Sequence, residues 1–427
     1  MNAIASHLAS IIGNNAVYSW ENLSPSQQQL ITPALATGKP PSCLVYPETQ
    51  AQLATIITTA NNNKWRVLPC GSGSKLKWGG LAENIDIVVS TEKLNQLIEH
   101  AVGDLTVTVE AGMKFSQLQE ILGKARQAIA LDPYSPTSAT IGGIVATADT
   151  GSLRQRYGSV RDQLLGISFV RADGEIAKAG GRVVKNVAGY DLMKLFTASY
   201  GTLGIISQVT IRVYPLPETS ATVVLTGNAE AISQAAATLK ASALTPTQAD
   251  LISSSLVSRL NLGQGLGLIT RFQSISESVK EQSNRLLEIG QKLGLQGAIY
   301  AAENEANLWI ELPNQIHDTT TNTAITCKIG ILPTAAVKIL TGVEIGLIHI
   351  SSGLGLARLE NQNQVLALRN LCQSHYGFLT VLAAPVELKQ RIDVWGYTGN
   401  ALDIMHRLKK QFDSNYILSP GRFVNGI

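Results

Sequence analysis

The residues best suited to holding an anion stand in one short loop, residues 70–75, which reads CGSGSK. The loop directly follows residues 65–69, an apolar segment that predicts a β-strand. Consecutive backbone N–H groups in such a turn form an anion-binding nest, to which serine hydroxyls add donors and Lys75 adds a positive charge. The GxxxxGK[ST] spacing of a P-loop is absent, and the residues after Lys75 are a poor helix start for a GxGxxG loop. Taken alone, the loop fits phosphate binding and a tight structural turn equally well.

A second segment, residues 136–147, reads PTSATIGGIVAT and places Gly142 and Gly143 side by side in an apolar run. Adjacent glycines suit a site where backbone must lie against a flat group, and the alternative is close packing of a helix on a strand. Residues 132–151 are rich in Pro, Ser, Thr and Gly, which predicts irregular structure without regular elements.

A third segment, residues 180–217, predicts a turn at 186–189, a short helix from Asp191 and a glycine hinge from Gly201 to Gly204. A strand at residues 205–214 follows, with alternating apolar and polar residues, and Pro215 and Pro217 close it. Glycine-bearing turns before a strand leave backbone N–H groups open to a ligand.

Side chains that catalyse reactions directly are scarce. The six histidines are scattered without an HxH or HExxH spacing, which argues against a metal site. The cysteines Cys43, Cys70, Cys327 and Cys372 form no CxxC pair, so we expect four reduced thiols and no iron–sulfur cluster in this chain. No GxSxG elbow is present, and no catalytic residue can be assigned. The pattern is typical of a protein whose cofactor carries the reaction.

Composition bounds the function classes. The chain has 427 residues, 45% of them hydrophobic and 15% charged, which indicates a globular protein of two or three domains. A formal net charge of +3 and the lack of a Lys/Arg block argue against nucleic acid. Apolar runs fall short of the roughly 18–20 residues that cross a bilayer, and the N-terminus does not resemble a signal peptide. We therefore expect a cytoplasmic protein, with docking onto a membrane-bound partner left open.

The elements that position these loops can be predicted coarsely. Strands at 43–46, 65–69, 85–89 and 105–110 and helices at 48–63 and 114–123 make a βαβ-type opening, and 165–171 with 175–179 predict a hairpin. From residue 219, helices at 229–243 and 276–292 alternate with strands at 308–312 and 324–331, which indicates an α+β domain with an antiparallel sheet. A last helix is predicted at 401–412.

Four stretches together resemble the vanillyl-alcohol oxidase and p-cresol methylhydroxylase (PCMH) flavoprotein superfamily. They are LPCGSGSKL (68–76), DPYSPTSATIGGIVAT (132–147) with RYGSVRDQLLGI (156–167), the 180–217 segment, and FDSNYILSPGR (412–422). The third stretch is most similar to the E subunits of bacterial glycolate oxidases. The resemblance implies an α+β chain with an N-terminal helical segment (1–37), an FAD-binding PCMH-type domain of two α/β subdomains (38–218), a cap domain (219–390) and a C-terminal segment (391–427) that returns to the FAD domain.

The resemblance also implies the cofactor and its contacts. The cofactor is FAD, and it is non-covalent because the histidine of covalent members is missing from the 70–75 loop. The implied cofactor-binding residues fall in three groups: Cys70, Gly71, Ser72, Gly73, Ser74, Lys75 and Leu76 around the pyrophosphate; Pro136, Thr137, Thr140, Gly142, Gly143 and Thr147 along the flavin and ribityl chain; and Gly204, Ile205 and Ile206 on the other side.

The implied function is that of an FAD-binding oxidoreductase subunit. It would oxidise glycolate or a similar short 2-hydroxy acid in a complex with a second flavoprotein subunit, and pass electrons to an iron–sulfur subunit. Two departures bear on this: the region 349–355 keeps only His349 of the histidine-rich substrate site of D-subunit-type dehydrogenases, and Ser419 replaces the family's usual asparagine before Pro-Gly. The alternatives are a self-sufficient flavin dehydrogenase, which would need His349 and Arg358 at the flavin, and a non-catalytic structural subunit.

Overall fold

A computed structural model describes residues 3–36, 39–182, 189–317 and 324–427. The chain divides into two compact units. Unit 1 comprises Met1–Thr150, Ser159–Leu216 and Tyr397–Ile427, and unit 2 comprises Gly151–Gly158 and Pro217–Gly396. Unit 1 therefore gathers both ends of the sequence around the predicted cofactor loops. The domain boundaries predicted from the sequence stay predictions.

The first sheet of unit 1 has four strands in the order β1 (Val17–Ser19), β2 (Cys43–Val45), β4 (Ile87–Ser90) and β3 (Val67–Cys70). β2 and β3 both run parallel to β4, as the βαβ pattern predicts. Alternate residues face opposite sides: Val45, Val67 and Ile87 pack in one hydrophobic cluster, and Leu44, Leu68 and Val88 pack in another. The helices of this part are α1 (Ala3–Ile12), α2 (Pro25–Ile31) and α3 (Gln50–Asn63).

The second sheet of unit 1 is antiparallel, in the order β5 (Leu97–Ala101), β6 (Thr106–Glu110), β10 (Ile205–Arg212), β8 (Leu164–Val170) and β9 (Ile176–Gly180). The predicted hairpin is confirmed, because β8 and β9 pair antiparallel. A two-stranded ribbon joins β7 (Gln127–Ala128) to β11 (Tyr214–Pro215). The helices are α4 (Phe115–Gly123), α5 (Ile141–Thr147), α7 (Val160–Gln163), α8 (Leu192–Phe196) and α16 (Leu402–Phe412).

Unit 2 is built on one eight-stranded antiparallel sheet, which confirms the predicted α+β architecture. The strand order is β15 (Gln296–Ala301), β12 (Thr219–Gly227), β14 (Leu266–Ser274), β13 (Gln248–Ile252), β17 (Ile345–His349), β18 (Leu354–Leu359), β16 (Ile325–Gly330) and β19 (Phe378–Ala383). The helices are α6 (Arg154–Tyr157), α9 (Ala229–Ala241), α10 (Ser254–Arg259), α11 (Ser276–Lys292), α12 (Ala302–His317), α13 (Ala336–Thr341), α14 (Gln362–Ser374) and α15 (Val386–Lys389).

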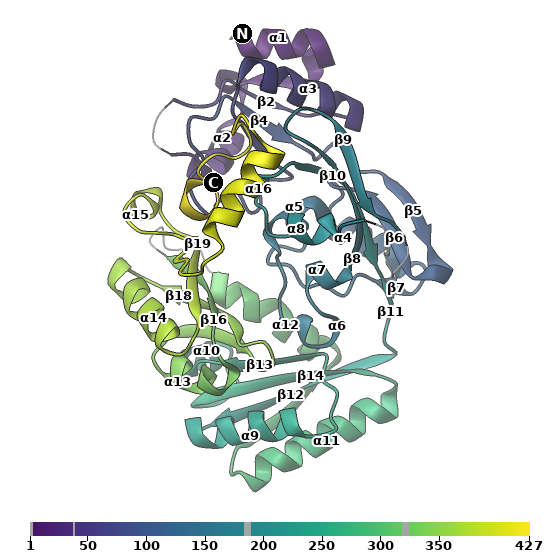
Figure 1. The fold of residues 1–427 in the computed structure, drawn as a ribbon. Coiled ribbons are helices and arrows are strands. Elements are labelled where there is room, and N and C mark those ends of the chain that lie inside the picture. Colours follow the sequence, from purple (N-terminus) through teal and green to yellow (C-terminus); the bar gives the residue numbers. More distant parts are fainter. Residues whose placement is uncertain (1–2, 37–38, 183–188, 318–323) are drawn as a thin grey trace. The chain divides into compact units, whose positions relative to one another are not determined.

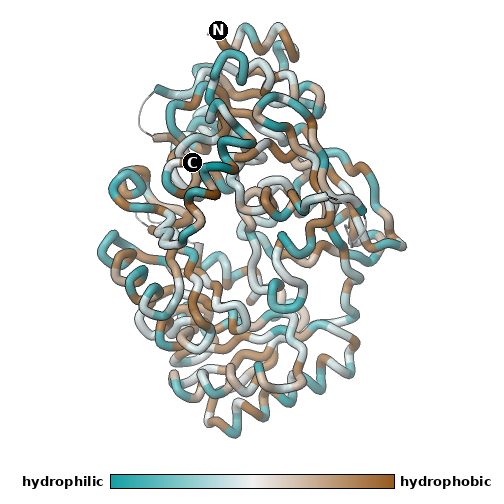
Figure 2. The backbone as a smooth tube through the Cα atoms, in the orientation of Figure 1, coloured by the Kyte–Doolittle hydropathy of each residue, from teal (hydrophilic) through white to brown (hydrophobic). Residues whose placement is uncertain are grey.

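The two faces of this sheet carry separate cores. One cluster joins the sheet to α9, α11, α13 and α14, and Figure 1 shows α9 and α11 side by side on that face. The other cluster joins the opposite face to α10 and α12. The buried positions of α11 are Val279, Ser283, Leu286 and Gly290, which lie at helical spacing, and the rest of the helix is largely hydrophilic (Figure 2), as expected of a helix that buries one stripe of residues.

Two predictions about elements are wrong. Residues 308–312 were predicted as a strand but lie inside α12, where Leu308, Leu312 and Ile316 recur at helical spacing and are buried. Residues 132–151 were predicted to lack regular elements, but they contain α5, capped by the Thr140 side chain. The predicted turn at 186–189 lies largely outside the described residues. In the described ranges, no helix combines the length and apolar character needed to cross a bilayer.

Buried hydrogen bonds of Lys409 tie the C-terminal segment to the rest of unit 1. Lys409 on α16 is fully buried, and its Nζ donates to Asp413 Oδ2 (2.7 Å) and to the Thr202 and Leu418 carbonyl oxygens (2.9 and 2.7 Å). Asp413 in turn accepts from the backbone N–H groups of Ile417 and Leu418. Since these bonds satisfy both charges, they tie the chain end to the glycine hinge at Thr202.

Candidate functional site

A cavity with roughly 680 Å³ of empty space, part of it open to solvent, lies in unit 1. Three chain segments that the sequence analysis singled out meet at it. Fourteen of the sixteen predicted cofactor residues line it: Cys70, Gly71, Ser72, Gly73, Ser74, Lys75, Leu76, Thr140, Gly142, Gly143, Thr147, Gly204, Ile205 and Ile206. Pro136 and Thr137 do not; they are exposed, and their carbonyl oxygens accept hydrogen bonds from Ser116.

The loop 70–75 leaves the end of β3 and is held by neighbouring segments. The Thr91 backbone N–H donates to the Cys70 carbonyl oxygen (2.9 Å), and Ser90 Oγ donates to the Gly71 carbonyl oxygen (3.1 Å). Ser72 Oγ donates to the Ser138 carbonyl oxygen, which joins the loop to the segment before α5. Burial raises the pKa of the Cys70 thiol to about 12, so this side chain is neutral at physiological pH. The loop is thus a preformed wall of main chain.

Glycine at positions 71 and 142 is explained by packing between segments. A Cβ on Gly71 would lie 2.0 Å from Thr140 Oγ1, and a Cβ on Gly142 would lie 2.7 Å from the Ala111 Cβ. The packing alternative therefore accounts for Gly142, and close approach of a ligand is not needed to explain it. Thr140 Oγ1 accepts from the Gly143 backbone N–H (3.3 Å), which caps α5 beside the cavity.

The glycine hinge closes the cavity from the third side. The backbone N–H groups of Ala198 and Tyr200 donate to the carbonyl oxygens of Val145 and Ala146 on α5 (3.1 and 2.9 Å). Gly201 has φ +74°, and a Cβ there would lie 2.6 Å from the Pro69 Cγ. Only glycine fits this position, because both its backbone conformation and its space exclude a side chain.

The charges at the cavity differ from the sequence prediction. Lys75, expected to supply the positive charge, forms a buried ion pair with Asp149 (Nζ–Oδ2, 2.9 Å). Asp149 is also fixed by the Tyr134 backbone N–H. The Lys75 charge is therefore balanced by a carboxylate of the same unit.

Arg422, which sequence analysis did not assign to the site, also lines the cavity. Its side chain is buried, and Nη1 donates to the carbonyl oxygens of Leu76 and Gly80 (2.9 and 2.8 Å). Burial lowers the pKa of the guanidinium to about 10, so it stays charged at neutral pH. The residues that sequence analysis missed are Pro69, Thr91, Ala146, Tyr200, Gly201 and Arg422. Gly201 stood in the predicted hinge and Arg422 ended the C-terminal motif, so the sequence held a signal for both.

Unit 2 places a second set of polar groups on one face of its sheet. His349, at the end of β17, lies opposite Asp250 on β13, and Nδ1 is 2.6 Å from Asp250 Oδ1. Asp250 is fully buried. A buried carboxylate beside one ring nitrogen orients an imidazole, as in sites where a histidine acts as a base. Across the part of the chain that the structure describes, no three His, Cys, Asp or Glu side chains gather in a metal-binding group.

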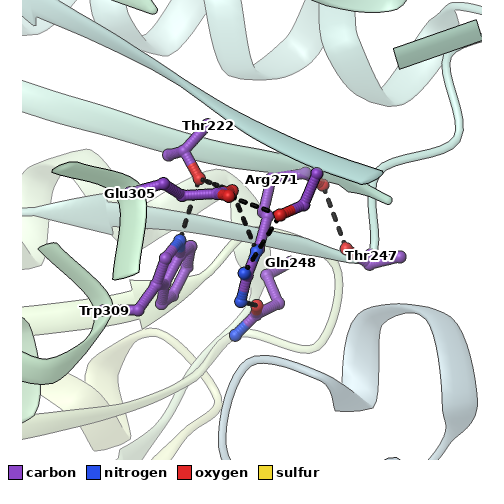
Figure 3. A network of polar contacts seen from close by, with 7 residues as sticks. Thr222, Thr247, Gln248, Arg271, Glu305 and Trp309 are labelled. Atoms are coloured by element: carbon purple, nitrogen blue, oxygen red, sulfur yellow. Dashed lines mark hydrogen bonds and ion pairs between the residues drawn. The ribbon is translucent and has the colours of Figure 1, made fainter. Parts of the chain in front are cut away.

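A larger polar network lies on the same sheet (Figure 3). Glu305 on α12 accepts from Arg271 Nε (3.0 Å), from Thr222 Oγ1 (2.7 Å) and from Ser220 Oγ. Trp309 Nε1 donates to Thr222 Oγ1 (2.8 Å), and the Arg271 guanidinium lies over the Trp309 ring. The network fixes α12 to β12 and β14, and these bonds all run between groups of unit 2.

The cavity of unit 1 suits a phosphorylated cofactor. Its walls are mostly main chain and small side chains, which allow close approach, and Arg422 adds a buried cation. Within the described ranges Arg422 Nε has no hydrogen-bond partner, so a buried donor is available beside the cavity. These features fit an anion-bearing group such as the diphosphate of FAD.

Comparison with known proteins agrees with this fit. The family model of the FAD binding domain matches residues 41–180. D-lactate dehydrogenase [cytochrome] of Arabidopsis thaliana is 28% identical over 280 residues, covering 63% of this chain and 49% of the relative. Glycolate oxidase subunit GlcD of Bacillus subtilis is 30% identical over 213 residues, covering 50% of this chain and 45% of the relative. The chain spans about half the length of these two relatives.

A solved structure extends the likeness to the whole fold. The crystal structure of p-cresol methylhydroxylase with bound substrate has a TM-score of 0.76 and 15% sequence identity, and covers 98% of this chain and 96% of that one. At this identity the likeness concerns the fold alone. It includes the antiparallel sheet of unit 2, which the FAD-binding model does not reach.

Proposed function

Since residues 41–180 are an FAD-binding domain of the PCMH and vanillyl-alcohol oxidase type, we propose that this chain is an FAD-dependent oxidoreductase acting on glycolate or a similar short 2-hydroxy acid. The observation that carries the proposal is the meeting of three cofactor segments and Arg422 at one cavity. The relatives D-lactate dehydrogenase and the glycolate oxidase subunit are named for two short 2-hydroxy acids, which supports the substrate class.

In this proposal, the bound FAD supplies the acceptor for the hydride that leaves C2 of the hydroxy acid. The chain's own residues do the rest. The 70–75 loop binds the anionic part of the cofactor, and the hinge and α5 fix its position by main-chain contacts. The FAD is held without a covalent bond, because the loop reads Gly-Ser-Gly-Ser where covalent relatives carry histidine.

The proposal includes partners. The electrons leave to an iron–sulfur subunit, in a complex that also holds a second flavoprotein subunit, and the cytoplasm is the proposed location. The support is the similarity of the 180–217 segment to glycolate oxidase E subunits. Co-purification of the tagged chain from its native cells, followed by iron and labile-sulfide analysis, tests this; a chain that elutes alone under mild conditions contradicts it.

A second candidate is a self-sufficient dehydrogenase, and the His349–Asp250 pair favours it. Oxidation of a 2-hydroxy acid requires a proton acceptor for the hydroxyl group as well as a hydride acceptor. His349, oriented through Nδ1 by a buried carboxylate, has the chemistry of such a base. The two candidates differ in whether the isolated chain turns over its substrate.

The first test is anaerobic flavin reduction. We expect the purified chain to be yellow, to release intact FAD into the supernatant on acid precipitation, and to be reduced by glycolate or D-lactate within its native complex. Bleaching of the isolated chain at a comparable rate would favour the self-sufficient dehydrogenase. An FAD-loaded chain that stays oxidised in the complete complex would contradict both enzymatic readings and favour the structural subunit.

A further inference from the structure

Arg422 is a buried cation at the cavity wall, and the described part of the chain places no carboxylate in ion-pair distance of it. We propose that Arg422 binds the diphosphate of FAD, so that the C-terminal segment, and not Lys75 of the glycine loop, supplies the positive charge of the cofactor site. The inference rests on the proposed function, which places FAD in this cavity.

The hydrogen bonds of Arg422 leave a donor for a ligand. The side chain is part of a residue that is only 4% exposed. Nη1 is held by two carbonyl oxygens, those of Leu76 and Gly80, at 2.9 and 2.8 Å. Nε is buried and has no hydrogen-bond partner among the residues that the structure describes. A buried donor without a partner is costly, so this group indicates an acceptor other than the described residues of the chain.

The charge of Arg422 leads to the same conclusion. Within the described residues, no carboxylate lies within ion-pair distance of its guanidinium, whereas Lys75, the other cation lining the cavity, is paired with Asp149 at 2.9 Å. Burial of an unpaired charge is expensive in every redox state of the protein. A permanent anion compensates it at all times, and in FAD this is the diphosphate. Negative charge on the flavin ring would arise only on reduction.

Arg369 shows what a purely structural buried arginine looks like in this chain. It is 8% exposed, and it donates through Nε to the Leu379 carbonyl oxygen (3.3 Å) and through Nη2 to the Asp393 carbonyl oxygen (2.7 Å). Its Nε is therefore satisfied by the protein. Arg422 differs in two ways, because its Nε is unpaired and it lines the cavity.

The fold holds Arg422 in place before any ligand binds. The segment around it pairs with β3, because Val67 N–H donates to the Ile417 carbonyl oxygen and Ser419 N–H donates to the Val67 carbonyl oxygen (2.7 and 2.8 Å). The Gly80 N–H donates to the Arg422 carbonyl oxygen (3.0 Å). The buried Lys409–Asp413 pair fixes the same segment from α16. A cation positioned in this way loses little entropy on binding an anion.

The test compares flavins with and without the diphosphate. Flavin is removed reversibly from wild type, Arg422→Gln and Arg422→Lys, and the affinities for FAD and riboflavin are measured by flavin fluorescence. We expect Arg422→Gln to weaken FAD about 10- to 100-fold and to leave riboflavin unchanged, as loss of a charge-assisted hydrogen bond predicts. Arg422→Lys should recover part of the FAD affinity. Arg369→Gln, the matched control, should lower stability without changing the ratio of the two affinities.

Three outcomes would overturn the inference. Equal weakening of FAD and riboflavin would show that Arg422 acts on the flavin ring or through the fold. An unchanged FAD affinity in Arg422→Gln would show that it does not bind the cofactor. A lowered flavin midpoint potential with normal FAD affinity would place its charge at the reduced ring. Failure of wild type to bind FAD would contradict the proposed function itself, which keeps the two failures distinguishable.

Discussion

At the scale of single residues, Ser74 offers a direct test of the anion-binding role of the 70–75 loop. Gly73 is unsuitable, because it has φ +80° and a Cβ there would lie 2.5 Å from the Leu30 side chain. Ser74 lines the cavity without needing such a conformation. We expect Ser74→Asp to lower FAD content at least about tenfold, since a carboxylate would face the diphosphate. The ratio of absorbance at 450 nm to that at 280 nm in the purified protein measures it.

Ser74→Asn is the matched control for this prediction. It has nearly the same size and shape as Asp but no charge, and it should retain most of the FAD. If both variants lost flavin equally, the effect would be steric, and the loop would be a structural turn without an electrostatic role.

The residues also show where sequence reasoning reached its limit. The loop, the Gly142 segment and the hinge could be predicted because small residues at glycine-bearing turns indicate main chain that lies close to another chain segment or to a ligand. The assignment of charge could not, because Lys75 and Asp149 are 74 positions apart and only folding pairs them. For the same reason Arg422 could not be placed beside Leu76, far away in sequence.

At the scale of elements, helix α12 illustrates both the error and its physical cause. Its apolar residues Leu308, Trp309 and Ile310 are consecutive, which mimics a short buried strand, while the helical spacing becomes visible only over the longer stretch to Ile316. Most elements with clear periodicity, such as α3, α4 and α11, could be predicted to within a few residues. Short segments were harder, because tertiary contacts decide their structure.

Glu305 makes the polar contacts that fix α12 to the sheet, and we predict that its removal destabilises unit 2. Glu305→Ala would leave Arg271 with an unbalanced charge and would remove the acceptor of Ser220 and Thr222. We expect unit 2 to lose about 3 kcal/mol of unfolding free energy, the low end for a broken buried pair because Arg271 is partly exposed. Urea unfolding followed by circular dichroism measures it. Glu303→Ala, which removes an exposed acid of the same helical turn, should cost only a few tenths of a kcal/mol.

At the scale of the whole molecule, the chain consists of two units. Unit 1 contains the candidate cofactor cavity and is assembled from both ends of the sequence, and unit 2 has its own sheet and hydrophobic cores. The C-terminal segment belongs to unit 1. Residues 417–419 pair with β3, and the buried Lys409–Asp413 ion pair holds the same segment. The fold class and this return could be inferred from the resemblance of the sequence motifs. The strand order of the eight-stranded sheet could not, because it depends on long-range pairing such as that of β13 with β17.

Buried thiols in both units predict that the protein loses stability in alkali. Burial raises the pKa of Cys43 and Cys327 to about 12 and that of Cys372 to about 11, from an ordinary value of 9.0. Above pH 9 the unfolded chain therefore releases thiol protons that the folded chain keeps, and the free energy of unfolding falls as pH rises. Each thiol should lower the free energy of unfolding by about 1.4 kcal/mol between pH 8 and pH 10.

The experiment must isolate the thiol contribution with a variant, because burial lowers the pKa values of Lys409 and Arg422 and these two groups act in the opposite direction. Guanidinium unfolding under reducing conditions measures the free energy of unfolding of unit 2 at pH 8 and at pH 10. The decrease between the two pH values should be about 1.4 kcal/mol smaller in Cys327→Ala than in wild type. Equal losses in the two proteins would show that the Cys327 thiol does not titrate as its burial requires.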